Sequence, residues 1–256
     1  MVSFTFATLT VALALFTQTA VALPSPNVDS NGTYVKRAAS CSFPKASKTT
    51  SLKEPMTIKG TFDGKLVRYD RGKKCSGQKE GGDKDAVFLL EEGATIKNVI
   101  IGANQAEGIH CKGSCNVYNV WFEAVCEDAI TLKQKSGTSN IVGGGAKGAK
   151  DKVIQHNGGG NVKIDSYCVQ NFGKLYRACG NCKTQYKRTV NISNIIAKNG
   201  KLLAGINSNY GDIAHINTKS NSYSSVKSIC DTFKGNDNGK EPSKLTSNKK
   251  TTNCDF

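Results

Sequence analysis

Short apolar segments recur along the chain at intervals of twenty-odd residues. The segment at 96–100 is followed by others at 117–121, 139–142, 162–165, 190–195 and 213–217. Asn119 lies 21 positions after Asn98, and Asn140 lies 21 positions after Asn119. Each segment is rich in β-branched residues and too short for a helix. A repeat of this period predicts a solenoid in which each segment is one strand of a stacked turn.

A second series of strands keeps step with the first. Its members are Glu107-Gly-Ile109, Asp128-Ala-Ile130, Lys152-Val-Ile154 and Lys174-Leu-Tyr176. Two series in phase require at least two strands in every turn of the chain. The sequence therefore predicts an all-β protein with a single parallel β-helix.

Charged residues occupy equivalent positions of the second series. In-phase residues on adjacent turns stack roughly 4.8 Å apart, so Glu107, Asp128 and Lys152 are predicted to lie in a line, with Glu127 beside Asp128. This requires a bend between each charged residue and the core residue two positions later. Neighbouring carboxylates repel each other unless a cation lies between them. Oxygen ligands without histidine indicate calcium or magnesium.

The ends of the chain and its cysteines indicate secretion. An apolar run ending in Ala20-Val-Ala22 predicts a signal peptide over 1–22, and Lys36-Arg37 closes a possible pro-peptide over 23–37. The body, 38–256, holds all 10 cysteines, which predicts disulfides in a secreted chain, with the pairing left open. Cys179 and Cys182 are predicted to take part in disulfides rather than in a redox or zinc motif, and Cys254 is predicted to tie down the C-terminal tail.

The formal net charge of +15 predicts a polyanionic partner. No later segment is apolar enough to cross a membrane, and the sparse aromatic residues do not form a platform for nucleic-acid bases. An acidic extracellular polysaccharide is the partner that fits, and a monomer is the default expectation. Asn191-Ile-Ser193 is a possible glycosylation site.

Several sequence blocks together resemble pectate lyases of polysaccharide lyase family 3, of the secreted fungal type. The resemblance covers roughly 43–233. It implies a right-handed β-helix, a Ca²⁺ requirement and β-elimination of polygalacturonate. The blocks are Glu80-Gly-Gly-Asp83, Ala94 to Ile100, Glu107-Gly-Ile-His-Cys111, Cys126-Glu-Asp-Ala-Ile-Thr131, Asp151 to Asn157 and Phe172-Gly-Lys-Leu-Tyr-Arg177.

The resemblance also implies roles for individual residues. Lys152 and Arg177 are the candidate bases, and Lys152 is favoured with Arg177 as a clamp for the substrate carboxylate, because lysine loses its proton more readily than arginine. The remaining residues are metal ligands or substrate contacts. The implied metal ligands are Glu107, Glu127 and Asp128, and the implied substrate contacts are Lys133, Lys174 and Glu80.

Two other functions compete with a lyase. A polygalacturonase-like hydrolase would need a second pair of carboxylates acting as acid and base, which the sequence does not show. A non-catalytic solenoid could bind polyanions by charge alone. The predicted line of Glu107, Asp128 and Lys152 argues against that alternative, because binding by bulk charge needs no carboxylate cluster.

Overall fold

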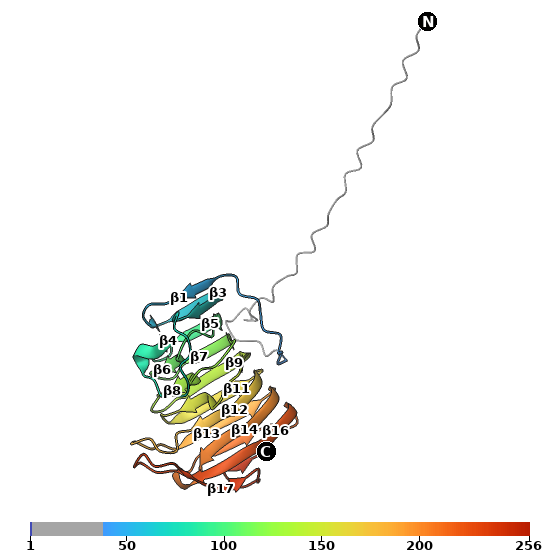
Figure 1. Ribbon diagram of the computed structural model, residues 1–256. Coiled ribbons are helices and arrows are strands. Elements are labelled where there is room, and N and C mark those ends of the chain that lie inside the picture. The colour runs from blue at the N-terminus through green and yellow to red at the C-terminus, as the bar shows by residue number, and fades with distance from the viewer. Residues whose placement is uncertain (2–37) are drawn as a thin grey trace.

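The chain is wound into a parallel β-helix with almost no other secondary structure (Figure 1). The computed structural model describes Met1 and residues 38–256, so the predicted signal peptide and pro-peptide lie outside the described residues apart from Met1. Two short 3-10 helices, η1 (Asp83–Asp85) and η2 (Ser208–Tyr210), interrupt the strands. No described helix has the length and apolar character needed to cross a membrane. The strands are β1 (Thr49–Ser51), β2 (Met56–Ile58), β3 (Thr61–Asp70), β4 (Ala86–Leu90), β5 (Thr95–Ile101), β6 (Glu107–Cys111), β7 (Asn116–Phe122), β8 (Asp128–Leu132), β9 (Thr138–Lys147), β10 (Lys152–His156), β11 (Gly160–Asp165), β12 (Cys168–Ala178), β13 (Arg188–Ser193), β14 (Ile196–Asn207), β15 (Ile213–Ile216), β16 (Ser222–Lys234), β17 (Ser243–Ser247) and β18 (Cys254–Asp255).

Three parallel ladders of strands run along the β-helix. The first contains β2, β4, β6, β8, β10 and the C-terminal halves of β12, β14 and β16. The second contains β11, β13, β15, β18 and the N-terminal parts of β3, β5, β7 and β9. The third contains β1, the C-terminal parts of β3, β5, β7 and β9, and the N-terminal halves of β12, β14 and β16. The predicted parallel β-helix is confirmed, with three strands per turn.

The register confirms one predicted series and corrects the other. Lys152 pairs with Asp128 on one side and with Lys174 on the other, as the second series predicts. The step of 21 from Asn119 to Asn140 is wrong, because Asn140 pairs with Asn116, 24 positions earlier. Cys111 pairs with Leu132, but Asn116 follows Cys111 by 5 positions whereas its partner Asn140 follows Leu132 by 8, and this difference shifts the pattern.

Asparagine marks the corner between the second and third ladders because the chain turns there in the left-handed conformation. Asn98 and Asn119 have φ of 53° and 52°, a region that asparagine tolerates better than most residues. The Asn119 side-chain nitrogen donates to the Asn98 side-chain oxygen at 2.9 Å, which joins adjacent turns. Gly143, with φ of 66°, continues this corner in the next turn.

Apolar side chains from all three ladders fill the interior as one continuous cluster that includes Ile109, Ile130 and Ile154. The cysteines pair completely within the described chain as Cys41–Cys168, Cys75–Cys126, Cys111–Cys115, Cys179–Cys182 and Cys230–Cys254. Cys179 and Cys182 form a disulfide with each other, which confirms the predicted bridge-forming role of the two cysteines, and the predicted anchoring of the tail by Cys254 is confirmed.

Candidate active site

The first ladder brings the predicted charged residues together on one face. Asp128 opens β8, Lys152 opens β10 in register with it, and Lys174 lies opposite Lys152 on β12. The residues after the first two, Ala129 and Val153, belong to the apolar core, as do the residues one position further on. Two consecutive core residues break strict alternation. The side chains of Asp128 and Lys152 can therefore point away from the core. This agrees with the bend predicted between each charged residue and the core residue two positions later.

Three carboxylates form the most compact acidic group in the described part of the chain. One oxygen from each of Glu80, Glu127 and Asp128 lies within 4.8 Å of the others. Glu127 and Asp128 are buried, with 3% and 1% of their surface exposed, whereas Glu80 is exposed. Among the described residues, neither oxygen of Asp128 nor Oε2 of Glu127 has a hydrogen-bond partner.

This group has the character of a site for a hard cation. Burial raises the pKa of Asp128 well above its ordinary value, and the neighbouring Glu127 and Glu107 raise it further, although Lys152 opposes them. Desolvation, followed by the charge of Glu127, likewise raises the pKa of Glu80. Unpaired buried carboxylate oxygens are costly unless a partner satisfies them. A calcium ion, which takes six to eight oxygen ligands, fits such a donor set.

Glu107 lies beside this group but is held by other partners. Its Oε1 accepts from the backbone N–H of Gly81 at 2.8 Å, and its Oε2 lies 3.4 Å from Nε2 of His110. Glu107 was expected among the metal ligands and Glu80 among the substrate contacts. The structure instead gathers Glu80 with Glu127 and Asp128, and leaves Glu107 next to them on β6.

Lys152 is surrounded by carboxylates. Its Nζ donates to Asp151 at 2.9 Å and to Glu127 at 3.1 Å, and lies 3.4 Å from Asp128. Burial alone would lower the pKa of Lys152, but these carboxylates outweigh burial and raise it above its ordinary value. Asp151 also accepts from Lys174, so the two predicted lysines share one carboxylate.

Lys133 belongs to a separate polar group at the edge of the site. Its Nζ donates to Asp83 at 2.6 Å, and Nδ1 of His110 lies 2.9 Å from the same oxygen. Burial would raise the pKa of Asp83, but these two partners lower it to about 2. Lys133 keeps about a third of its side chain exposed (34%), so it can also face a bound anion.

Arg177 lies further along the same face, three residues after Lys174 on β12. It is 6% exposed, and its guanidinium carbon lies 4.1 Å from the ring centroid of Phe233. Its Nη1 donates to the backbone oxygen of Ala178 at 2.7 Å and to Oδ1 of Asn207 at 3.1 Å. Burial lowers the pKa of Arg177 to about 10, against the opposing charge of Asp212.

The sequence analysis assigned no role to three residues of the site, Asp83, Asp151 and Asn207. Asp83 and Asp151 lie in the quoted sequence blocks, and their proximity along the chain to Glu80 and Lys152 was a usable signal. Asn207 gave no such signal, because it lies 30 positions after Arg177 and belongs to no block.

On one face of this parallel β-helix, buried carboxylates lie beside lysines. A family model described as pectate lyase matches residues 40–240. The chain belongs to the pectate lyase family and is an enzyme of that kind, which confirms the resemblance found in the sequence.

Relatives extend along most of the chain. A probable pectate lyase E from Neosartorya fischeri is 57% identical over 225 residues, covering 87% of each chain. Pectate lyase E from Emericella nidulans is 57% identical over 215 residues, covering 83% of this chain and 84% of the relative.

Solved structures of bacterial pectate lyases share the fold. The catalytic domain of pectate lyase PelI from Erwinia chrysanthemi is 32% identical, with a TM-score of 0.66, and covers 82% of this chain and 94% of its own. A structure of PelI in complex with tetragalacturonic acid is 33% identical, with a TM-score of 0.64, covering 77% of this chain and 66% of its own.

Proposed function

We propose that this enzyme cleaves (1→4)-α-D-galacturonan, the de-esterified form of pectin, by calcium-dependent β-elimination that leaves 4,5-unsaturated oligogalacturonates. The observation that carries the proposal is that both oxygens of Asp128 and Oε2 of Glu127 are buried without a hydrogen-bond partner among the described residues, next to the ammonium group of Lys152. Carboxylates that need a cation, beside fixed positive charges, suit a substrate that itself carries carboxylates. The similar PelI structure with bound tetragalacturonic acid supports this choice of substrate.

The residues that would hold calcium are Glu80, Glu127 and Asp128, with Glu107 close beside them. Bound calcium would neutralise the carboxylate of a galacturonate unit and thereby make its C5 proton more acidic. The chain's own part is to keep these carboxylates ionised and oriented. Lys152 supplies the positive charge, and the Gly81 N–H and His110 hold Glu107 in place.

The contacts favour Arg177 as the acceptor of the C5 proton, whereas the sequence alone favoured Lys152. The Lys152 ammonium is shared among Asp151, Glu127 and Asp128. Arg177 has no carboxylate within ion-pair distance among the described residues, and its burial favours loss of a proton. Lys152 then serves as a fixed positive charge that faces the substrate carboxylate.

Substrate binding would draw on Lys133 and Lys174, each of which keeps about a third of its side chain exposed beside the acidic group. The net charge of +15 would increase the encounter rate with a polyanion. The five disulfides suit an extracellular enzyme acting on plant cell-wall pectin. The possible glycosylation site Asn191 lies on β13, partly exposed between Lys163 and His215. The enzyme is proposed to act as a monomer.

The proposed reaction is tested by ultraviolet absorbance of polygalacturonate mixed with the purified chain at alkaline pH. One sample contains added calcium and a second contains excess chelator. A rise in absorbance only with calcium supports elimination, because the product contains a double bond conjugated to a carboxylate. New reducing ends without a rise in absorbance would indicate hydrolysis instead. Salt-sensitive binding without turnover would indicate a polyanion-binding solenoid.

A further inference from the structure

Arg177 is buried, and no carboxylate among the described residues lies within ion-pair distance of it. Its Nη1 has two neutral acceptors, the Ala178 carbonyl and the Asn207 amide oxygen, and its flat face lies against Phe233. Within residues 38–256 the structure shows no hydrogen bond from its Nε or Nη2. Buried arginines are ordinarily paired with an acid, because removing the charge from water is costly. The neutral partners place no negative charge beside Arg177 that would hold its proton.

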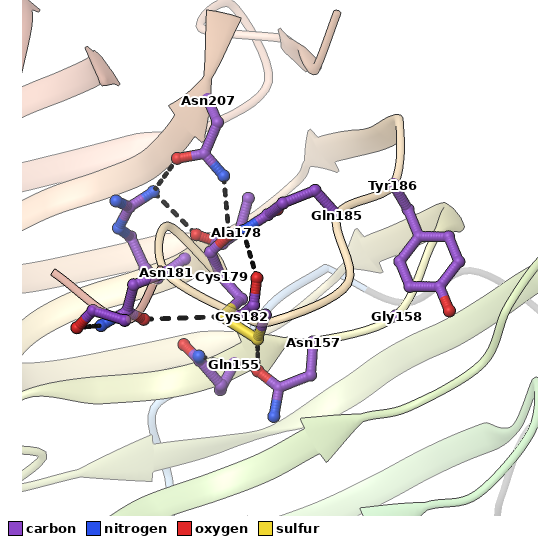
Figure 2. The surroundings of a disulfide bond; sticks show 12 residues. Gln155, Asn157, Gly158, Ala178, Cys179, Asn181, Cys182, Gln185, Tyr186 and Asn207 are labelled. Atoms are coloured by element: carbon purple, nitrogen blue, oxygen red, sulfur yellow. Dashed lines mark hydrogen bonds between the residues drawn. A yellow bond between two sulfur atoms is a disulfide. The ribbon is translucent and has the colours of Figure 1, made fainter. Parts of the chain in front are cut away.

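Hydrogen bonds fix both the side chain and the backbone of Asn207. Its side chain is completely buried, and its amide nitrogen donates to the Cys179 carbonyl at 2.8 Å (Figure 2). Its backbone N–H donates to Asp212 at 2.9 Å, and the same carboxylate accepts from the backbone N–H of Arg188. A carbonyl can only accept and a guanidinium can only donate, so the amide has one orientation that satisfies both.

We propose that Asn207 is a positioning residue for Arg177: its neutral amide orients the guanidine group toward the substrate and places no negative charge beside it. The inference rests on the proposed role of Arg177 and deepens it. An aspartate at this position would form the same contact, but its negative charge would hold the proton on Arg177. A neutral amide orients the group and avoids this effect.

Within the described part of the chain, the other groups near Arg177 interact with it without accepting a hydrogen bond. Asp212, Glu241 and Tyr176 act on the guanidinium by charge from a distance, and Arg188 opposes them. Lys244 lies 5.7 Å from the ring centroid of Phe233, so that ring has a cation near it besides Arg177. None of these groups accepts a hydrogen bond from Arg177 in the described structure. Asn207 is the only side chain in the described structure that accepts a hydrogen bond from the guanidinium.

Gly180 adds a second, independent constraint on the same group. A Cβ atom at this position would lie 2.6 Å from Nη2 of Arg177 and 2.4 Å from Cγ of Pro242. Glycine therefore lets the disulfide loop of Cys179 and Cys182 close over Arg177. Gly180→Ala should displace the guanidinium without touching Asn207.

The test compares Asn207→Ala, Asn207→Asp and Gly180→Ala with Arg177→Ala and with the double variant Asn207→Ala/Arg177→Ala. Asn209→Ala is the matched control, because Asn209 also bonds to a backbone oxygen, that of Gly235, but does not touch Arg177. Turnover of polygalacturonate with calcium is measured against pH. Thermal unfolding and calcium binding by calorimetry report whether each variant folds and keeps its acidic site.

The expected result is that Asn207→Ala and Gly180→Ala lose between about tenfold and about a hundredfold in kcat, because small displacements of a reacting group are costly. Asn207→Asp should move the acidic limb of the pH profile upward by about one unit or more, because an adjacent carboxylate raises the pKa of Arg177. Asn207→Ala should cost nothing further once Arg177 is alanine. Asn209→Ala should match the parent enzyme.

Two results would overturn the inference, and they differ in what else they reject. If Arg177→Ala leaves a measurable residual rate and Asn207→Ala lowers that rate by the same factor as in the parent enzyme, Asn207 does not act through Arg177 and only this inference fails. If Arg177→Ala is fully active, the proposed role of Arg177 fails and the inference fails with it. In both cases the elimination reaction itself is judged separately, by the calcium-dependent rise in absorbance of the unaltered chain.

Discussion

The ammonium group of Lys152 lies 3.4 Å from Oδ1 of Asp128 on the neighbouring strand, yet neither Asp128 oxygen accepts a hydrogen bond within the described chain. The pair is in contact but incompletely satisfied. Glu127 repeats the pattern, since one of its oxygens bonds to Lys152 and the other has no partner. A site of this kind stores an unfavourable interaction that a bound cation would relieve.

Replacing Asp128 with asparagine should therefore separate metal binding from folding. We expect Asp128→Asn to abolish the rise in melting temperature that calcium gives the parent enzyme, because a ligand stabilises only the state that binds it. Without calcium the variant should melt at or above the parent temperature, because one of several repelling buried carboxylates is gone. Thermal unfolding in chelator and in excess calcium measures both effects. A variant that keeps the full calcium-induced rise would contradict the assignment.

Lys152→Ala should have the opposite effect on the calcium-free protein. Removing one partner of a buried ion pair leaves uncompensated charge, which costs about 3 to 5 kcal/mol of unfolding free energy. Excess calcium should recover much of that loss, because the cation supplies the missing positive charge. Urea unfolding with and without calcium provides the measurement. Lys163→Ala, on the exposed surface of β11, is the matched control and should be neutral in both conditions.

Much of this site could be predicted because the first ladder repeats regularly. Glu107, Asp128 and Lys152 open successive strands of the first ladder, and Lys174 takes the next register position within β12. Spacings of 21, 24 and 22 residues are regular enough to place the four in a line. The chemistry of the aligned residues then indicates a cation and an acidic chain. No side-chain contact needs to be known for that step, since strand register alone determines which residues are neighbours.

The rest depends on contacts that leave no periodic signal. Glu80 lies in an irregular segment whose path is fixed by the Cys75–Cys126 disulfide, and spacing along the chain does not reveal that pairing. Asn207 approaches Arg177 through the stacking of β14 on β12. The Asn140 register failed for a related reason, because a longer connection before β9 changes the step without changing the local pattern.

His156 predicts how stability depends on pH away from the acidic cluster. Burial, followed by the charge of Arg188, lowers the pKa of His156 to about 3, against the opposing bond to Gly159. The unfolded chain binds this proton near the ordinary value of about 6.5, so the folded state binds fewer protons between these two values. The contribution of His156 to the unfolding free energy should therefore be full above about pH 6.5. It should decrease as the pH falls below this value, by up to about 1.4 kcal/mol per pH unit.

The His156 effect can be isolated with His156→Gln. This variant loses the contacts of the imidazole with Tyr176 and Gly159, so it should be less stable throughout. Its unfolding free energy should nevertheless change less steeply between about pH 5 and about pH 7, because most carboxylates do not titrate there. Chemical unfolding across this range gives the two slopes. Equal slopes for the variant and the parent would show that His156 does not bind the extra proton.

The Cys75–Cys126 disulfide should control the affinity for calcium through the position of Glu80. Cys126 directly precedes Glu127, and its carbonyl also accepts from Gln78 at 2.5 Å, so two links hold the Glu80 segment against the acidic pair. Replacing both cysteines with serine should weaken calcium binding about tenfold or more, because ordering a loosened ligand then opposes binding. Calorimetric titration of the folded variant with calcium measures the change.

Removal of Cys230–Cys254 is the matched control, because that bridge ties the C-terminal tail to β16 and lies outside the acidic group. Losing a native disulfide costs roughly 2 to 5 kcal/mol, so both double variants should melt at lower temperature. Only the loss of Cys75–Cys126 should also reduce the affinity for calcium. If both double variants bind calcium as tightly as the parent enzyme, Glu80 reaches the acidic pair without the disulfide. If both lose affinity to the same extent, general destabilisation weakens the site.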